Sequence, residues 1–163
     1  WSSTTWSNDL VAEGIYVGDA SHKFIISLTD IGSVAMYSST SPTASLSTGY
    51  STTTYNGKTN TDVLLSTFGN DNSYASAKAY TTISPSGKNG YIGSVGEWNM
   101  VQTNITAINN LLTLLGVTTI SGNYWTSSLY STYRYYDYDG ALSSSDYTSQ
   151  SSSLKVRPFY TIN

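Results

Sequence analysis

The first hydrophobic pattern in the chain is that of two short β-strands joined by a turn. Residues 13–17 (EGIYV) and 23–28 (KFIISL) are rich in β-branched and aromatic side chains, and a Gly-Asp-Ala-Ser run lies between them. Such runs on either side of a short polar turn predict a β-hairpin. Residues 34–37 (VAMY) predict a further short strand. Residues 38–56 have no hydrophobic period and are rich in Ser and Thr, so they predict a long loop.

Two short helices are predicted after this loop. Asn60 or Thr59 is suited to cap a helix over residues 61–68, with Asp62 in its first turn, where the helix dipole favours a negative charge. Gly69 is suited to end that helix. Residues 74–80, which contain three alanines, predict a second helix.

The clearest helix start in the chain lies at residues 94–97. Ser94 and Glu97 have the S-x-x-E spacing of a capping box, in which the carboxylate accepts a hydrogen bond from the first backbone N–H. This role is sufficient to explain Glu97, and we assign it no catalytic function. Apolar residues then recur at helical spacing as far as Leu115. Asn104 is expected to divide this stretch into two helices, and Gly116 to end the second.

The C-terminal part of the chain returns to a β pattern. Residues 124–127 and 154–160 predict strands, and Pro158 restricts the second strand to a sheet edge. Because strands, helices and strands follow one another in this order, the sequence predicts an α+β fold. The 163 residues suit one domain, residues 1–163. The chain opens on Trp1, so residues 1–12 are expected to be a linker or interdomain segment of a longer protein.

Composition adds a functional expectation to this outline. The stretch 128–153 consists almost wholly of Tyr, Ser, Asp and Thr, and we interpret it as exposed, with no part in a buried core. Binding loops favour this composition, because Tyr offers a large rigid surface and Ser adapts its hydrogen bonds. Net charge of −3 with scattered basic residues argues against nucleic-acid binding, and no apolar run approaches the length of a membrane span. The absence of Cys excludes disulfides, thiolate metal sites and a Cys nucleophile.

Within this stretch, ten residues are candidates for direct ligand contact. The tyrosines at 133, 135, 136 and 138 do not alternate strictly, so some of them are expected to point outward, although tyrosines on one face of a sheet would give a similar composition. Clustered exposed aromatic residues are typical of interaction sites. The candidate residues are Tyr130, Tyr133, Arg134, Tyr136, Asp137, Asp139, Ser144, Asp146, Tyr147 and Ser149.

Other residues favour structural interpretations. His22 is expected to be a solvated residue of the hairpin turn. The three aspartates of the candidate set lack the pattern of an EF-hand loop, and Asp139-Gly140 is a strong turn signal, so these acids predict turns or binding contacts instead of a calcium site. Large apolar residues are predicted to form the core, namely Trp98, Trp125, Leu111, Leu112 and Leu115.

Several motifs, taken in order, resemble one known family. These are GIYVGDASHKFIISL (14–28), GKTNTDVLLSTFG (57–69), SYASAKAY (73–80), GYIGSVGEW (90–98), YWTSS (124–128) and VRPF (156–159). Together they resemble the C-type-lectin-like fold, in the branch shared by formylglycine-generating enzymes and the variable proteins of diversity-generating retroelements. The resemblance spans nearly the whole chain.

This resemblance implies a binding platform. In the retroelement-diversified proteins an irregular C-terminal segment is displayed at one face and is rewritten at template adenines. The segment between YWTSS and VRPF resembles such an outcome. Formylglycine-generating enzymes act through cysteines bound to copper, which this chain lacks, and the Glu-Pro-Asn, Gln-Pro-Asp and Trp-Asn-Asp motifs of calcium-binding lectins are also absent. We therefore expect a non-enzymatic protein without a cofactor or metal.

The expected function is receptor binding or adhesion at the tip of a phage tail fibre or on a bacterial surface structure. The expected partner is a protein or carbohydrate on a target cell, with no nucleic acid and no membrane insertion, and a homo-oligomer such as a fibre trimer is possible. Two alternatives stay open. One is a structural virion or pilus subunit in which the Tyr/Ser stretch packs between chains. The other is an enzyme of the sulfatase-modifying type that has lost its cysteines.

Overall fold

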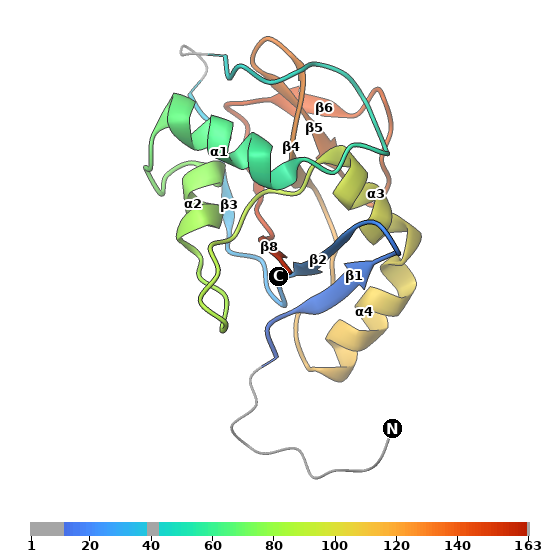
Figure 1. The fold of residues 1–163 in the computed structure, drawn as a ribbon. Coiled ribbons are helices and arrows are strands. Elements are labelled where there is room, and N and C mark those ends of the chain that lie inside the picture. Colours follow the sequence, from blue (N-terminus) through green and yellow to red (C-terminus); the bar gives the residue numbers. More distant parts are fainter. Residues whose placement is uncertain (1–11, 39–42, 163) are drawn as a thin grey trace.

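The computed structural model describes residues 12–38 and 43–162, and it has the predicted α+β architecture (Figure 1). A three-stranded antiparallel sheet, sheet A, has the order β1-β2-β8, with β1 at Ile15–Gly18, β2 at Lys23–Ile26 and β8 at Phe159–Thr161. A five-stranded sheet, sheet B, has the order β3-β7-β4-β5-β6. Its strands are β3 (Ser33–Val34), β7 (Leu154–Lys155), β4 (Tyr124–Ser131), β5 (Arg134–Tyr138) and β6 (Tyr147–Ser149).

The N-terminal hairpin forms as predicted. β1 pairs with β2 from Ile15↔Ile26 to Gly18↔Lys23, and the intervening turn is closed by the Asp19 carboxylate, which accepts the backbone N–H groups of Ser21 and His22. The expected exposure of His22 is confirmed in part, since its side chain is 42% exposed and stacks on Tyr55. The strand expected over residues 34–37 is wrong in extent, because β3 comprises only Ser33–Val34.

The predicted C-terminal strand divides between the two sheets. Leu154 and Lys155 form β7 beside β4 in sheet B, whereas Phe159 begins β8, which is the edge strand of sheet A next to β2. Arg157 and Pro158 lie between these two strands. This short segment therefore joins the two sheets. The prediction of an edge strand holds for β8 in sheet A but is wrong for β7, which pairs with β3 on one side and β4 on the other.

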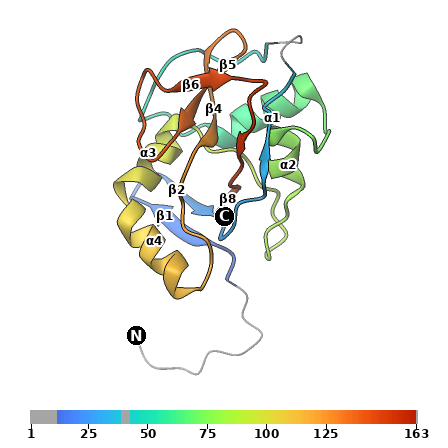
Figure 2. The ribbon, with the colours of Figure 1, turned by 180° about the vertical axis from the view of Figure 1, so that it is seen from behind.

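Four helices occur in the described residues: α1 (Gly57–Phe68), α2 (Ala75–Thr81), α3 (Val95–Thr103) and α4 (Ile105–Leu114). Figure 2 shows α1 and α2 on one side of β4 and α3 and α4 on the other. The break at Asn104 and the end at Gly116 are confirmed. The start of α1 was predicted too late, since Asn56 is its N-cap. Asp62 therefore lies beyond the first turn, where it pairs with Lys58.

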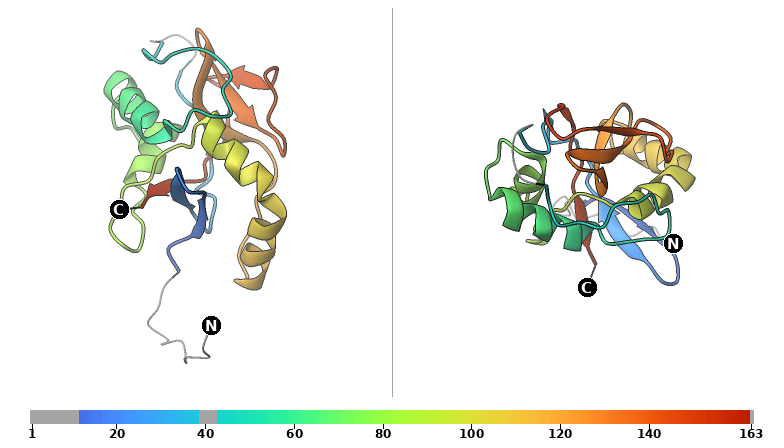
Figure 3. Two further views of the ribbon diagram at one scale, coloured as in Figure 1. Left: turned by 45° about the vertical axis from the view of Figure 1, so that its right-hand side comes forward. Right: turned by 90° about the horizontal axis from the view of Figure 1, so that it is seen from above.

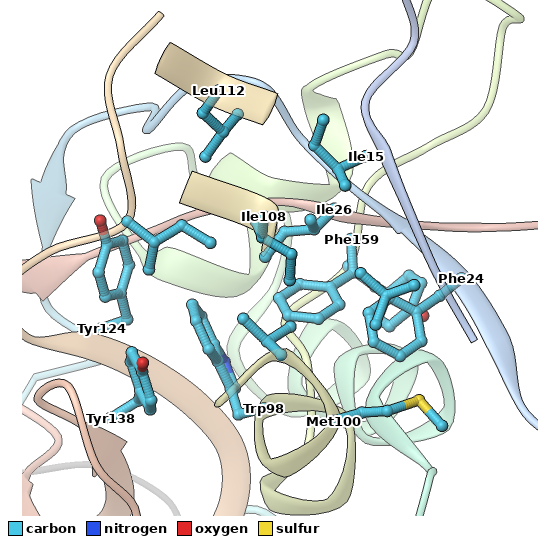
Figure 4. Packing of buried hydrophobic residues seen from close by; sticks show 14 residues of the cluster. Ile15, Phe24, Ile26, Trp98, Met100, Ile108, Leu112, Tyr124, Tyr138 and Phe159 are labelled. Atoms are coloured by element: carbon cyan, nitrogen blue, oxygen red, sulfur yellow. The ribbon is translucent and has the colours of Figure 1, made fainter. Parts of the chain in front are cut away.

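Two hydrophobic clusters lie on the two faces of β4. Tyr124 points into a cluster with Trp98, Phe159 and residues of β1, β2 and α4 (Figure 4). Its neighbour Trp125 points the other way, into a cluster with α1, α2 and Val156. Side chains alternate along a strand, so a strand covered on both faces carries continuous apolar residues. The buried Tyr124-Trp125 pair therefore links the two hydrophobic clusters through β4.

One predicted part of the core is wrong. In α4, Ile108 and Leu112 are buried one turn apart, but Leu111 and Leu115 are 46% and 47% exposed. Leu114 is 82% exposed. Because α4 packs along a single stripe, residues next to that stripe stay open to solvent. The predicted linker over residues 1–12 lies almost wholly outside the described residues. None of the helices in residues 12–38 and 43–162 has the length and apolar character needed to cross a membrane.

The buried side chain of Arg157 stabilises the segment that connects the two sheets. Arg157 is fully buried, and its guanidinium donates to the carbonyls of Ser27, Leu28 and Thr118 at 2.6–3.1 Å. It also pairs with Asp30 at 3.1 Å. A guanidinium carries five N–H donors in a fixed fork, so one side chain can hold several chain segments. Arg157 therefore has a structural function that the sequence pattern did not reveal.

A buried carboxylate joins two helix starts. Glu97 accepts the backbone N–H of Ser94 at 2.7 Å, which confirms the capping box, and also the N–H of Gly57 at 3.0 Å. The hydroxyls of Ser94 and Tyr91 donate to the same carboxylate. Burial raises the pKa of Glu97, and these four hydrogen bonds act against that rise. One side chain thus satisfies free N–H groups at the starts of both α1 and α3.

We predict that Gly57→Ala lowers the free energy of unfolding by at least about 2 kcal/mol. A methyl group at this position would collide with the Glu97 carboxylate and lie 2.7 Å from the Ile92 carbonyl oxygen. Alanine is the better helix former, so propensity alone predicts the opposite sign. Urea denaturation measures the difference. Thr59→Ala, an exposed change in the same helix, is the control and should alter stability by less than about 0.5 kcal/mol. A stabilised Gly57→Ala protein would contradict the shared cap.

Candidate binding surface

The candidate residues gather at one end of the molecule. The ends of β4, β5 and β6 lie at the top of Figure 1, at the opposite end from the start of β1. Residues 43–56 pass alongside them, and the view from above in Figure 3 shows both segments at this end. The contact is a backbone bridge between Thr48 and Leu129, with the Gly49 N–H donating to the Leu129 carbonyl at 3.2 Å. We call this end the display surface: residues 47–51, 130–134 and 139–149.

Four tyrosines form a connected cluster, in which Tyr50, Tyr130 and Tyr147 belong to the display surface and the buried Tyr136 lies beneath them. The rings of Tyr130 and Tyr147 stack with centroids 3.7 Å apart, and the Tyr130 ring meets that of Tyr136 edge-on at 5.4 Å. Tyr136 in turn meets Tyr50 at 5.4 Å. The Arg134 guanidinium lies 5.3 Å from the Tyr147 ring centroid, within the range of a cation–π interaction. The neighbouring Tyr147 hydroxyl raises the pKa of Tyr130. These contacts order the rings before any ligand arrives.

Tyr133 lies at the tip of the β4–β5 hairpin in a strained conformation. Its φ angle is 63°, and it is the single non-glycine residue with positive φ in the described part of the chain. A left-handed conformation costs a residue with a Cβ atom about 1–2 kcal/mol. The Tyr133 carbonyl accepts the Gln150 N–H at 2.8 Å, and the side chain is 39% exposed. The hairpin therefore holds an aromatic ring outward at a position that glycine would occupy with less strain.

The structure separates the ten predicted contact residues into three groups. Five are exposed: Tyr133, Arg134, Asp139, Ser144 and Ser149. Three are partly buried: Tyr130, Asp146 and Tyr147. The expectation of exposure is wrong for Tyr136 and Asp137, which are 4% and 7% exposed. Both lie in the middle of β5, between neighbouring strands.

The interpretation of residues 128–153 as wholly outside the core is also wrong. Tyr135 packs edge-on against Trp125 in one cluster, and Tyr138 stacks on Trp98 in the other. The two tyrosines lie three residues apart in β5, so the alternation of the strand sends them to opposite faces. Because sheet B is covered on both faces here, a tyrosine run supplies core and surface from the same strand.

Asp137 is the most perturbed carboxylate of this region. Burial raises its pKa to about 6, and the nearby charges of Asp139 and Asp146 add to the rise. Its Oδ1 atom has no hydrogen-bond partner among the described residues. Among residues 12–38 and 43–162, no group of three or more His, Cys, Asp or Glu side chains could hold a metal ion.

Sequence reasoning missed the contribution of residues 43–56, which it treated only as a loop. This loop and β4 enclose a cavity of about 240 Å³ that opens beside the tyrosine cluster. Tyr50 belongs to both features, because its ring lines the cavity and contacts Tyr136. The one available signal was the isolated Tyr50 within a run of small polar residues.

Comparisons with protein-family models, with curated protein sequences and with solved structures find no match to this chain.

We predict that Asp137 makes stability depend on pH. The pKa of Asp137 in the folded protein lies above its ordinary value of 3.8. Its favourable contribution to the free energy of unfolding is therefore complete below pH 3.8 and is lost as the pH rises through about 6. Asp137→Asn should remove this dependence and raise the free energy of unfolding at pH 7.5 by up to about 3 kcal/mol. Urea denaturation at pH 4.5 and 7.5 measures both values. Asp139→Asn should give a smaller change of the same sign, and a destabilised Asp137→Asn protein at pH 7.5 would contradict the assignment.

Proposed function

We propose that this chain is a non-enzymatic receptor-binding or adhesin domain of C-type-lectin-like fold, similar to the variable proteins of diversity-generating retroelements. The observation that carries the proposal is the display surface itself. It combines clustered tyrosines, one arginine and flexible hydroxyl groups at one end of the molecule. Aromatic and arginine side chains dominate the energetics of protein recognition, and Ser adapts its hydrogen bonds to the partner.

The display surface lies on strands that buried side chains hold in place, and this rigidity favours recognition of a ligand. Binding residues on rigid elements lose little conformational freedom when a ligand binds. Here Trp125 and Trp98 hold β4 and β5 in place. The indole N–H of Trp125 donates to the Val34 carbonyl, and the indole N–H of Trp98 donates to the Trp125 carbonyl. The exposed residues lie at the ends of these strands. A diversified segment could therefore change its outer side chains while the buried rings keep the platform in place.

Two alternatives are less well supported. An enzyme needs converging nucleophiles, acids or cofactor ligands, and the one carboxylate near the display surface with a strongly raised pKa, Asp137, is buried beneath it without a basic or nucleophilic partner aimed at it. A structural subunit would pack its exposed apolar side chains between chains. The largest such group lies on α4, at Leu111, Leu114 and Leu115, away from the tyrosine cluster. If copies of the chain associate, for example as a trimer, α4 is the better interface.

The proposed setting is a phage tail or a bacterial surface structure, with the display surface directed toward a protein or carbohydrate of the target cell. Neither nucleic acid nor membrane insertion has a place in this proposal. Several copies on one particle would raise the effective affinity of a weak single site. The start of β1 lies at the opposite end from the display surface, which leaves that surface free if the chain is attached through its N-terminal side.

We predict that Tyr133→Gly and Arg134→Ala each weaken binding to target cells at least tenfold, and that the double variant abolishes it. Tyr133→Gly should also raise the free energy of unfolding by about 1 kcal/mol, because glycine adopts the positive φ without strain. Labelled protein and a panel of bacterial strains, measured by flow cytometry, give the binding values. Urea denaturation gives the stability.

Tyr16→Ala is the matched control, since Tyr16 is 59% exposed on β1 at the other end of the molecule. This variant should bind as the parent does. Equal loss of binding in the control and in the double variant would argue against a role for the display surface. A Tyr133→Gly protein that is less stable than the parent would mean that the ring packs in the fold.

A further inference from the structure

We propose that the cavity between residues 47–56 and β4 binds a neutral saccharide unit of the target, so that this ligand spans both the cavity and the tyrosine cluster. The inference rests on the proposed binding function and adds the chemical class of the ligand. It also assigns a binding role to residues outside the Tyr/Ser stretch of 128–153.

The lining of the cavity is polar and uncharged. Five of its nine residues carry hydroxyl groups on short side chains, two are asparagines, and the others are Gly49 and Tyr50. The hydroxyl residues are Ser47, Thr48, Ser51, Thr54 and Ser128. None of the nine carries a charge. This differs from ordinary small-molecule pockets, which are mostly apolar with a few polar groups.

This lining discriminates between classes of ligand. A charged group entering the cavity would lose its hydration without meeting an opposite charge, which is strongly unfavourable. An apolar group would leave without partners those polar groups of the lining that the protein does not itself pair, at a cost of about 1–3 kcal/mol for each buried group. A neutral group with several hydroxyls avoids both penalties. Each hydroxyl can donate one hydrogen bond and accept others, so hydroxyls on ligand and protein can pair in either direction.

Tyr50 supplies an aromatic surface at the same place. Burial and the nearby Asp146 charge raise the pKa of Tyr50, so its phenol stays protonated and can both donate and accept. The ring offers an apolar face, which complements the C–H groups of a sugar ring while the hydroxyls pair with the polar lining. Because Tyr50 contacts Tyr136 at 5.4 Å, a ligand chain leaving the cavity would continue onto the tyrosine cluster.

The cavity is held open by internal hydrogen bonds. Asn60 donates to the Asn56 side chain at 3.3 Å and to the Ser127 carbonyl at 3.1 Å, which fixes α1 to β4. The Ser94 hydroxyl shares its one proton between the Glu97 carboxylate and the Thr54 carbonyl, which lies 2.9 Å away, and Ser51 and Thr54 share a hydrogen bond of 2.7 Å. These bonds tie the loop to the start of α3. A preformed site lowers the entropy lost on binding.

The first test is an NMR titration of the folded chain with single sugars. Neutral probes are D-glucose, D-galactose, D-mannose, L-rhamnose and N-acetyl-D-glucosamine, and acidic probes are D-glucuronic and N-acetylneuraminic acid. We expect at least one neutral sugar to shift the amide signals of residues 47–51 with a dissociation constant of about 1–10 mM, which is typical of a small single site. No shift with any neutral sugar, or tighter binding of an acidic one, would overturn the inference.

The second test fills the cavity. Ser47 is exposed and lines the cavity, so Ser47→Phe should reduce the affinity for the neutral sugar at least tenfold. Ser45→Phe adds the same ring two residues away, at an exposed position outside the lining, and should bind as the parent does. Urea denaturation confirms that both variants are folded. Tyr50→Ala is a second test variant, and it should also fail to bind the neutral sugar. Equal affinities of Ser47→Phe and Ser45→Phe would contradict the site.

Cell binding separates this inference from the proposed function. If the Tyr133→Gly, Arg134→Ala double variant no longer binds the target cells and Ser47→Phe still does, the β4–β5 hairpin contacts the cell and the saccharide site is wrong. If both proteins still bind the target cells, the proposed function itself is wrong. Periodate oxidation of the cells, which cleaves vicinal diols, should abolish binding. Loss of binding after protease treatment with resistance to periodate would identify a protein target and overturn the saccharide assignment.

Discussion

The arrangement of this domain depends on the buried Glu97 carboxylate. It accepts hydrogen bonds from the backbone of Gly57 and Ser94 and from the Tyr91 and Ser94 hydroxyls, and so joins the starts of α1 and α3. A buried carboxylate is costly unless its oxygens are satisfied, and here four donors satisfy it. Because α1 and α3 pack on β4, this one group fixes the two layers on either side of the central strand. The loop that lines the proposed cavity is tied to the same point through Thr54 and Ser94.

The central strand explains how one run of tyrosines serves two purposes. Tyr135 and Tyr138 fill the two clusters on opposite faces of sheet B, while Tyr133 stands outside at the hairpin tip. Tyr suits both places, because its ring is apolar and its hydroxyl is polar. The buried rings set the position of the strand, and the strand sets the direction of the outer side chains.

The candidate site is formed by segments far apart in the chain. Residues 47–51 meet β4 through the Thr48–Leu129 bridge, and Tyr50 extends the cluster that Tyr130, Tyr136 and Tyr147 begin. The result is a neutral cavity beside an aromatic surface that carries Arg134 and several aspartates. Asp137, beneath this surface, is sensitive to the charges of Asp139 and Asp146. The protonation of Asp137 and the charge of the overlying surface are therefore coupled through a few side chains.

The α+β order, the N-terminal hairpin, the capping box at Ser94 and Glu97 and the break at Asn104 could all be predicted from the amino-acid pattern. These are local features, set by periodicity and by hydrogen bonds between near neighbours. Long-range packing accounts for the exposure of Leu111 and Leu115, for the burial of Tyr136 and Asp137, and for the position of Tyr50 next to Tyr136. Long-range contacts also explain why Arg157 is buried in the segment that connects the two sheets. The reason is physical: burial and long-range contact depend on which elements cover each face, and a single strand pattern is the same whether one face or both are covered.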